Sequence, residues 1–209
     1  MRALRKRLIR LVLWLTGWDT EGIPPAEKRY VLIAYPHTSF WDFFLLLSYG
    51  MLYDIPLRFM IKDNVFKGPL GWILRSLGGV PINRSSKTNM VEKMVEALRN
   101  SEHMVLSVPP EGTRKWVPHW KTGFYYVALQ ADVPLVLSFI DGPRRRFGVG
   151  PMVRLTGNIP KDLARIQEFY GNMRGINPEQ TSPIRFKDTE PEKAEIIANE
   201  DEIKGSSRS

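Results

Sequence analysis

The sequence predicts an α/β fold in which a mainly parallel β-sheet is flanked by helices, with an amphipathic helix at the N-terminus. Short β-rich runs alternate with longer helical patterns in the order βαβαβαβ, which is typical of parallel strands joined by crossover helices. Polar and glycine-containing motifs follow the strand-like runs, where ligands bind in open α/β sheets. With 209 residues, 43% of them hydrophobic, the chain can bury one good core and is most simply a single domain.

The individual elements follow from apolar spacing and composition. Strands are expected where β-branched and aromatic residues run together, and helices where apolar residues recur every three or four positions. The expected strands are Tyr30–Tyr35, Leu57–Ile61, Met104–Val108, Val133–Ile140 and Met152–Thr156. The expected helices are Phe40–Tyr53, Phe66–Leu77, Asn89–Arg99, Thr122–Ala131 and Asp162–Met173. Asn89 and Glu92 have the spacing of a capping box.

The N-terminal segment combines positive charge with an apolar helical face. Its basic residues, with no acidic residue among them, are Arg2, Arg5, Lys6, Arg7 and Arg10, and its apolar residues at helical spacing are Leu4, Leu8, Leu11, Val12, Leu15 and Trp18. This pattern indicates a helix lying in a membrane interface. The apolar run from Leu11 to Leu15 is far shorter than the roughly 20 residues that span a bilayer. A signal peptide and a helix packed on the protein's own core are the alternatives.

Composition narrows the class of partner. The formal net charge of +8 favours an anionic partner, either nucleic acid or acidic lipid. No recognised nucleic-acid motif is visible, so nucleic-acid binding is not expected. The absence of cysteine excludes disulfides and is compatible with a reducing compartment. His103 and His119 lack metal-ligand spacing with His37, so no metal is expected.

His37 and Asp42 form an HxxxxD spacing directly after the first strand-like run. An imidazole takes a proton near neutral pH, and a carboxylate partner fixes its tautomer and stabilises its charged form. Five residues of continuous helix rotate a side chain by about 140°, so the pair meets more easily if His37 precedes a helix capped by Ser39. We expect His37 to be a base oriented by Asp42. The alternative is a loop histidine beside an aspartate favoured by the helix dipole.

Two further motifs end in arginine, Gly79–Arg84 and Pro110–Arg114. A guanidinium fork suits the oxygens of a phosphate or carboxylate. Gly112 permits close backbone approach to a ligand, and neighbouring N–H groups could face a developing oxyanion. Glu111 can accept hydrogen bonds from substrate hydroxyls or hold an arginine in place. The simpler interpretation is solvated arginines and a tight turn at Glu111-Gly112.

The order of these motifs resembles the glycerolipid acyltransferase family, whose best-known members are the lysophosphatidic acid acyltransferases. Four ordered blocks carry the resemblance: His37 with Asp42, Gly79–Arg84, Glu111–Arg114 and Val133–Val136. They lie between about residues 30 and 140. Pro36 stands where the family commonly has asparagine, and Leu137 where the fourth block often has a second proline. Neither departure removes a reactive group, but both leave subfamily and substrate open.

The resemblance implies transfer of a fatty acyl group from an acyl thioester, acyl-CoA or acyl carrier protein, to the free hydroxyl of a lysophosphatidic acid-like acceptor. Glycerol 3-phosphate and other lysolipids remain open as acceptors. His37 would deprotonate the hydroxyl while Asp42 stabilises the imidazolium, with no serine or cysteine nucleophile and no cofactor. The implied acceptor-binding residues are Arg84, Glu111, Gly112, Thr113 and Arg114. A non-catalytic lipid-binding protein would use the same arginines without needing His37.

The expected organisation has three segments. They are an amphipathic membrane-interface helix over residues 1–20, an acyltransferase domain over 21–175 and a polar, mobile tail over 176–209. The N-terminal helix would place the protein peripherally at the cytoplasmic face of an anionic membrane. Lys115, Trp116, Trp120 and Lys121 follow the third block. They are expected either to help hold an anionic substrate and its lipid tail or to pack in the core.

Overall fold

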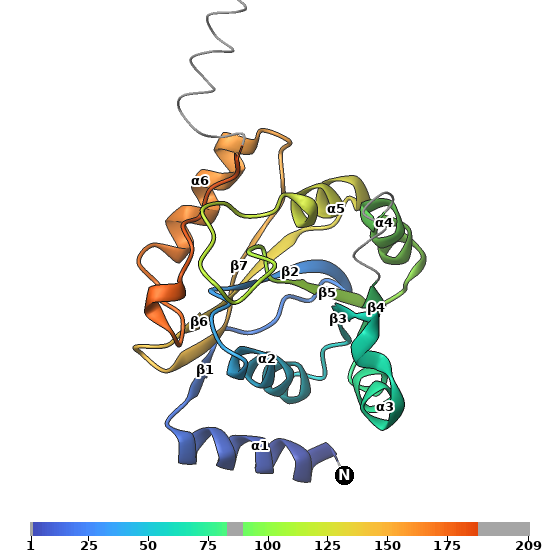
Figure 1. Ribbon diagram of the computed structural model, residues 1–209, viewed down its shortest axis with the longest axis vertical. Coiled ribbons are helices and arrows are strands. Elements are labelled where there is room, and N and C mark those ends of the chain that lie inside the picture. Colours follow the sequence, from blue (N-terminus) through green and yellow to red (C-terminus); the bar gives the residue numbers. More distant parts are fainter. Residues whose placement is uncertain (1, 83–89, 188–209) are drawn as a thin grey trace, which may run out of the picture.

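A seven-stranded sheet forms the centre of the computed structural model, which describes residues 2–82 and 90–187. The strand order is β1-β7-β6-β2-β5-β3-β4 (Figure 1). Neighbouring strands are parallel except for the antiparallel pair β6 and β7. The predicted fold class, a mainly parallel sheet flanked by helices with an additional helix at the N-terminus, is confirmed.

The strands are β1 Asp19–Glu21, β2 Arg29–Tyr35, β3 Leu57–Lys62, β4 Gly79–Ile82, β5 Met104–Val108, β6 Leu135–Asp141 and β7 Arg146–Val153. The α-helices are α1 Arg2–Thr16, α2 Trp41–Leu52, α3 Gly68–Ser76, α4 Met90–Asn100, α5 Gly123–Ala131 and α6 Ile159–Tyr170, and a short 3-10 helix, η1, spans Asp63–Phe66. The central elements agree with the predicted ones to within a few residues. Asn89, the expected cap of α4, lies outside the described residues.

The antiparallel edge of the sheet differs from the prediction. The strand expected at Met152–Thr156 is wrong in extent, because β7 begins at Arg146 and ends at Val153, and β1 was not predicted. Backbones approach closely at this edge: an added Cβ on Gly148 would lie 1.8 Å from the carbonyl oxygen of Glu21, and one on Gly22 would lie 1.8 Å from that of Val149. Glycine weakens a strand by its own propensity, which explains why the start of β7 was missed, whereas β1 is a polar tripeptide with no apolar pattern.

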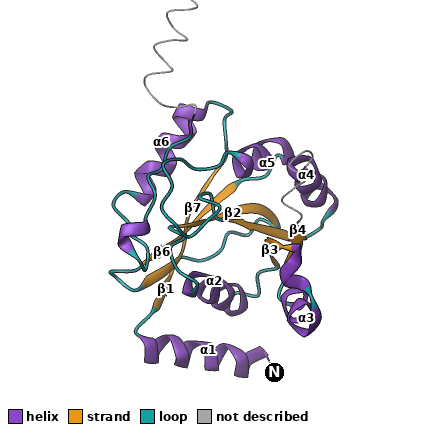
Figure 2. Cartoon of the chain, in the orientation of Figure 1, coloured by secondary structure: helices purple, strands orange, loops and turns teal. Residues whose placement is uncertain are grey.

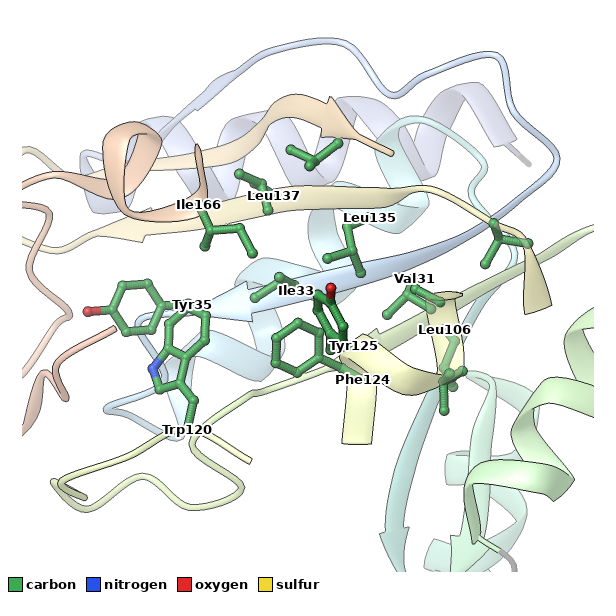
Figure 3. Close-up of a cluster of buried hydrophobic side chains, with 14 of the residues drawn as sticks. Val31, Ile33, Tyr35, Leu106, Trp120, Phe124, Tyr125, Leu135, Leu137 and Ile166 are labelled. Carbon is green, nitrogen blue, oxygen red and sulfur yellow. The ribbon is translucent and has the colours of Figure 1, made fainter. Parts of the chain in front are cut away.

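Helices cover both faces of the sheet, as Figure 2 shows. One face packs against α4, α5 and α6 through a continuous cluster that includes Leu98, Tyr125, Leu135 and Ile166, all at most 1% exposed. Figure 3 shows Tyr125, Leu135 and Ile166 of this cluster gathered around β2 and β6. The other face packs against α1 and α2 through a second cluster. Every side chain of β6 is buried, which fits a parallel-sheet interior covered on both faces.

Helix α1 contacts the body through a narrow face and exposes a wide one. Leu13 is buried and Ile9 packs beside it, while Arg5 and Lys6 hold Asp54 at 2.9 and 2.6 Å. The exposed apolar side chains of α1 are Leu4, Leu8, Leu11, Val12, Trp14 and Leu15. Trp18 was expected on that face, but it packs inward, with its ring 6.0 Å from that of Phe147.

No helix within the described part of the chain is both long enough and apolar enough to cross a bilayer.

The packed body extends beyond residue 175, where the sequence placed the start of a polar tail. Ser182 and Phe186 are each 1% exposed, and Phe186 pairs with Trp120 in an isolated β-bridge. Likewise β1 joins the sheet within the segment assigned to the N-terminal helix. The remainder of the expected tail, residues 188–209, lies outside the described residues.

Candidate active site

Two neighbouring parallel strands bring the first and third motifs together. His37 follows β2 after the cis Tyr35–Pro36 peptide bond, and Glu111 follows β5, which pairs in parallel with β2. The carboxyl ends of parallel neighbours lie at the same edge of a sheet, the usual place for a ligand. The sequence motifs therefore converge on one edge of the sheet.

His37 and Asp42 are in contact. The Nδ1 atom of His37 lies 3.1 Å from Oδ2 of Asp42, whose side chain is 4% exposed, whereas the imidazole is 23% exposed. A carboxylate that accepts from Nδ1–H leaves Nε2 with its lone pair, so Nε2 is the atom able to take a proton. The pair has the contact that a general base and its orienting carboxylate require.

The carboxylate of Asp42 also fixes the loop between the two residues. Its Oδ2 accepts hydrogen bonds from the backbone N–H groups of Thr38 at 2.7 Å and Ser39 at 2.8 Å, and the Ser39 hydroxyl accepts from the N–H of Trp41 at 3.2 Å. This reciprocal pattern resembles a capping box, with the Ser39 hydroxyl accepting from the second residue after it in place of the third. Helix α2 begins at Trp41, one residue later than a cap at Ser39 would place its start. Asp42 therefore holds the backbone at the start of the helix and contacts the imidazole of His37 with the same oxygen.

Glu111 holds the backbone of His37. Its Oε1 accepts the His37 N–H at 3.0 Å, and its side chain is 1% exposed. Burial, chiefly, raises the pKa of Glu111 to about 8, with the nearby Asp42 charge adding to the rise and the His37 hydrogen bond opposing it. One buried oxygen each of Glu111 and Asp42 has no partner within the described structure. Such atoms are costly to leave unpaired.

The turn after Glu111 gives the remaining residues of the third motif their positions. Gly112 has a φ of +66°, which favours glycine, and its own N–H donates to the carbonyl of Pro109 at 3.1 Å within the turn. Thr113 accepts from the N–H of Lys115 at 3.3 Å. Arg114 is exposed. Its guanidinium lies 5.7 Å from the ring centre of Phe40, which precedes Asp42 by two residues in the sequence.

The other expected residues divide into three groups. Arg84 lies outside the described residues, although β4 ends at Ile82 at the same edge of the sheet. Trp120 belongs to the core, with its ring 4.8 Å from that of Tyr35 (Figure 3). Trp116 is half exposed, and the amine end of Lys121 lies beside Gly112.

Sequence reasoning missed a set of hydrogen bonds, called the clamp below, that holds the loop between His37 and Asp42. The backbone N–H of Asn177 donates to the hydroxyl of Thr38 at 3.1 Å, and its side-chain Nδ2 donates to the Thr38 carbonyl at 2.7 Å. With its amide group turned so that the nitrogen faces the acceptors, Gln180 donates to the carbonyls of Thr38 at 3.1 Å and Arg114 at 2.6 Å. Glycines and a proline around residue 175 signal turns, but no local pattern marks these contacts.

Within the described residues, no group of three or more histidine, cysteine, aspartate or glutamate side chains could hold a metal ion.

Comparison with known families identifies the chain. The family model described as Acyltransferase matches residues 19–138, more than half of the chain. The chain belongs to this acyltransferase family. The match contains His37, Asp42 and the turn from Glu111 to Arg114, and it ends before the clamp formed by Asn177 and Gln180.

Relatives of this acyltransferase-family chain include two plant proteins. The chain is 29% identical over 140 residues to the 1-acyl-sn-glycerol-3-phosphate acyltransferase of Limnanthes alba and 27% identical over 140 residues to that of Limnanthes douglasii. Each match covers 63% of this chain and 48% of the relative. The chain therefore spans about half the length of these curated relatives.

A solved structure has the same fold. The crystal structure of the 1-acyl-sn-glycerophosphate (LPA) acyltransferase, PlsC, from Thermotoga maritima superposes with a TM-score of 0.59. The match covers 80% of this chain and 76% of that chain at 18% sequence identity. At this identity the likeness supports the fold, whereas the chemistry rests on the site residues themselves.

Proposed function

We propose that this chain transfers a fatty acyl group from an acyl thioester to the free hydroxyl of a lysophosphatidic acid-like acceptor at a membrane surface. The observation that carries the proposal is the contact between His37 Nδ1 and Asp42 Oδ2, on a loop held by Glu111. Family membership and the names of the relatives support the acyl-transfer class. Glycerol 3-phosphate and other lysolipids are the alternative acceptors.

The proposed reaction is a direct transfer. Nε2 of His37 takes the proton of the acceptor hydroxyl as its oxygen bonds to the thioester carbonyl carbon. The carbon–sulfur bond then breaks, and the thiolate leaves with the proton that the imidazolium returns, so protons and electrons balance. Asp42 keeps Nδ1 protonated and stabilises the imidazolium between the two steps. The donor is acyl-CoA or acyl carrier protein, and no further cofactor is invoked.

The acceptor's phosphate is assigned to arginine. Arg114 is exposed at the mouth of the site beside Phe40, and we propose that it binds the phosphate together with Arg84. Glu111, Gly112 and Thr113 complete the proposed acceptor site. Their part is to shape the turn that presents Arg114, as the buried Glu111 and the positive φ of Gly112 support.

The membrane part of the proposal rests on α1. Its exposed face is apolar, and Arg7 and Arg10 are exposed on the same helix. Such a helix binds the interface of an anionic membrane. We place the protein peripherally at the cytoplasmic face, where lysolipid acceptors and acyl thioesters meet.

Transfer assays test the proposal. Purified chain is given acyl-CoA or acyl carrier protein donors with lysophosphatidic acid, glycerol 3-phosphate or other lysolipids, and the esterified product is measured. Wild type should form product and His37→Ala should lose it. His103→Ala is the matched control, because that half-exposed histidine precedes β5 at the opposite edge of the sheet. Unchanged transfer in His37→Ala would reject the base assignment, and vesicle binding by a wild type without transfer would favour a lipid-binding protein.

A further inference from the structure

Helix α3 presents an apolar face with no protein partner among the described residues. Trp72 is 83% exposed, and Leu70 and Ile73 are 53% and 55% exposed. Trp72 is the most exposed large apolar side chain of the described structure. An exposed patch of this kind marks a surface that binds a partner or a membrane.

The helix is held firmly in its orientation. Gly71 and Leu74 form its buried side, and an added Cβ on Gly71 would lie 2.0 Å from the carbonyl oxygen of Phe66, so α3 packs closely on the preceding turn η1. The guanidinium of Arg75 lies 5.2 Å from the ring centre of Phe66. The outward direction of Trp72 and Ile73 is therefore set by packing against the body.

The charges within α3 and at its two ends are positive, and the preceding acidic residue is Asp63 at the start of η1. Lys67 immediately precedes the helix and Arg75 lies in its last turn, and no acidic residue occurs from residue 67 to residue 77. Tryptophan and aliphatic side chains flanked by cations suit the boundary between anionic headgroups and acyl chains. The same combination occurs on α1.

Helices α1 and α3 lie toward the same side of the molecule. In Figure 1 both lie in the lower part of the view, and α2 lies above α1 and to the left of α3. Two exposed aromatic side chains, Phe40 and Trp41, lie at the start of α2, between His37 and Asp42 in the sequence. A bilayer touching both α1 and α3 would thus also meet the mouth of the site.

We propose that α3 is a second membrane-inserting element, which together with α1 seats the start of α2 against an anionic bilayer. The inference rests on the proposed membrane docking of α1 and deepens it. One inserted helix leaves the body free to roll about the helix axis, whereas a second, separate contact fixes the plane of docking. Because both contacts belong to one chain, the second forms at high effective concentration and strengthens the first.

The absence of native cysteine permits a direct test. Single-cysteine variants Trp72→Cys, Leu11→Cys and Tyr126→Cys are labelled with an environment-sensitive fluorophore and mixed with vesicles of phosphatidylcholine and phosphatidylglycerol that carry a lipid-borne quencher. Tyr126 is the control, since it is exposed on α5, which covers the opposite face of the sheet. Labels at positions 72 and 11 should shift to shorter wavelength and be quenched, and the label at 126 should not.

Each other pattern is decisive. Quenching at 11 without quenching at 72 overturns the role of α3 while leaving α1 docking intact, and quenching at neither position overturns both. Quenching at 72 alone would keep α3 as a membrane contact but overturn the proposal that α3 and α1 dock together. If the fluorescence of the label at position 72 changed with an acidic carrier protein but not with vesicles, the apolar face of α3 would bind a protein partner, and the proposal would be overturned.

Binding and turnover give a second readout. Leu70→Ser/Trp72→Ser should weaken vesicle binding by about tenfold or more, because two large apolar side chains no longer enter the lipid. Transfer to an acceptor embedded in vesicles should fall with it, while transfer to a water-soluble short-chain acceptor should persist, which separates docking from catalysis. Tyr126→Ser should change neither, and unchanged vesicle binding in the double variant would contradict the proposal.

Discussion

The backbone N–H of His37 donates to Oε1 of Glu111 at 3.0 Å, across the ends of two neighbouring parallel strands. Glu111 therefore acts on the proposed base through the backbone that carries it. The same loop is held from the helix side by Asp42 and from the C-terminal segment by Asn177. Three residues far apart in sequence thus fix the position of one short loop.

Glu111 should make stability depend on pH. Burial raises its folded-state pKa from about 4.5 to about 8, so between these values the folded chain binds the proton that the unfolded chain has released. The contribution of Glu111 to stability is therefore greatest below pH 4.5 and falls as pH rises to about 8. Denaturant unfolding should show that wild type loses stability across this range relative to Glu111→Gln, which keeps an oxygen for the His37 N–H. Parallel pH profiles of the two proteins would contradict this prediction.

Asn177→Ala should lower turnover more than it lowers stability. The change removes the bond from Nδ2 to the Thr38 carbonyl, which costs about 1 kcal/mol of folding free energy. A small displacement of the loop between His37 and Asp42 should reduce kcat by about tenfold with little change in KM. Asn172→Ala, an exposed asparagine after α6, is the control. A variant with wild-type kcat would show that the clamp does not position the loop.

The close packing of the edge strand β1 should show in a pair of glycine substitutions. Gly22 and Gly157 both have positive φ, +78° and +84°, but an added Cβ would lie 1.8 Å from the Val149 carbonyl oxygen at Gly22 and would meet nothing within 4 Å at Gly157. Gly157→Ala should cost about 1 kcal/mol from backbone strain alone. Gly22→Ala should cost at least about 2 kcal/mol more, because the backbone must shift. Equal losses in thermal unfolding would rule out this account.

Local patterns predicted the central strands because these carry their own signal. Each strand from β2 to β6, apart from β4, contains a run of β-branched or large apolar residues that the sheet buries. In contrast, β4 has only four residues, one of them glycine and one proline, and β1 is the polar tripeptide at residues 19–21. Both form because a neighbouring strand offers hydrogen bonds, which a single segment cannot reveal.

The contacts of the candidate site also fall into two kinds, those that the local sequence predicts and those that depend on the topology of the sheet. His37 and Asp42 are five residues apart, so their contact follows from a helix start that the sequence marks with Ser39. The hydrogen bond from His37 to Glu111 depends on the pairing of β2 with β5, across 74 residues of chain. Asn177 is farther still, 139 residues from Thr38. Such contacts come from topology, and their residue types alone predict only polarity.

Asp42 tests whether the pair serves catalysis or only the helix start. Asp42→Asn keeps an oxygen that can accept the N–H groups of Thr38 and Ser39, but it removes the negative charge beside His37 Nδ1. Asp42→Ala removes both functions. If Asp42 orients and stabilises the imidazolium, Asp42→Asn should lower kcat by about 100-fold or more while its thermal stability stays close to that of wild type. Asp42→Ala should in addition lose about 1 kcal/mol of stability with the cap. Activity that tracked stability across the two variants would instead assign Asp42 to the helix start alone, because then only the loss of the cap would matter.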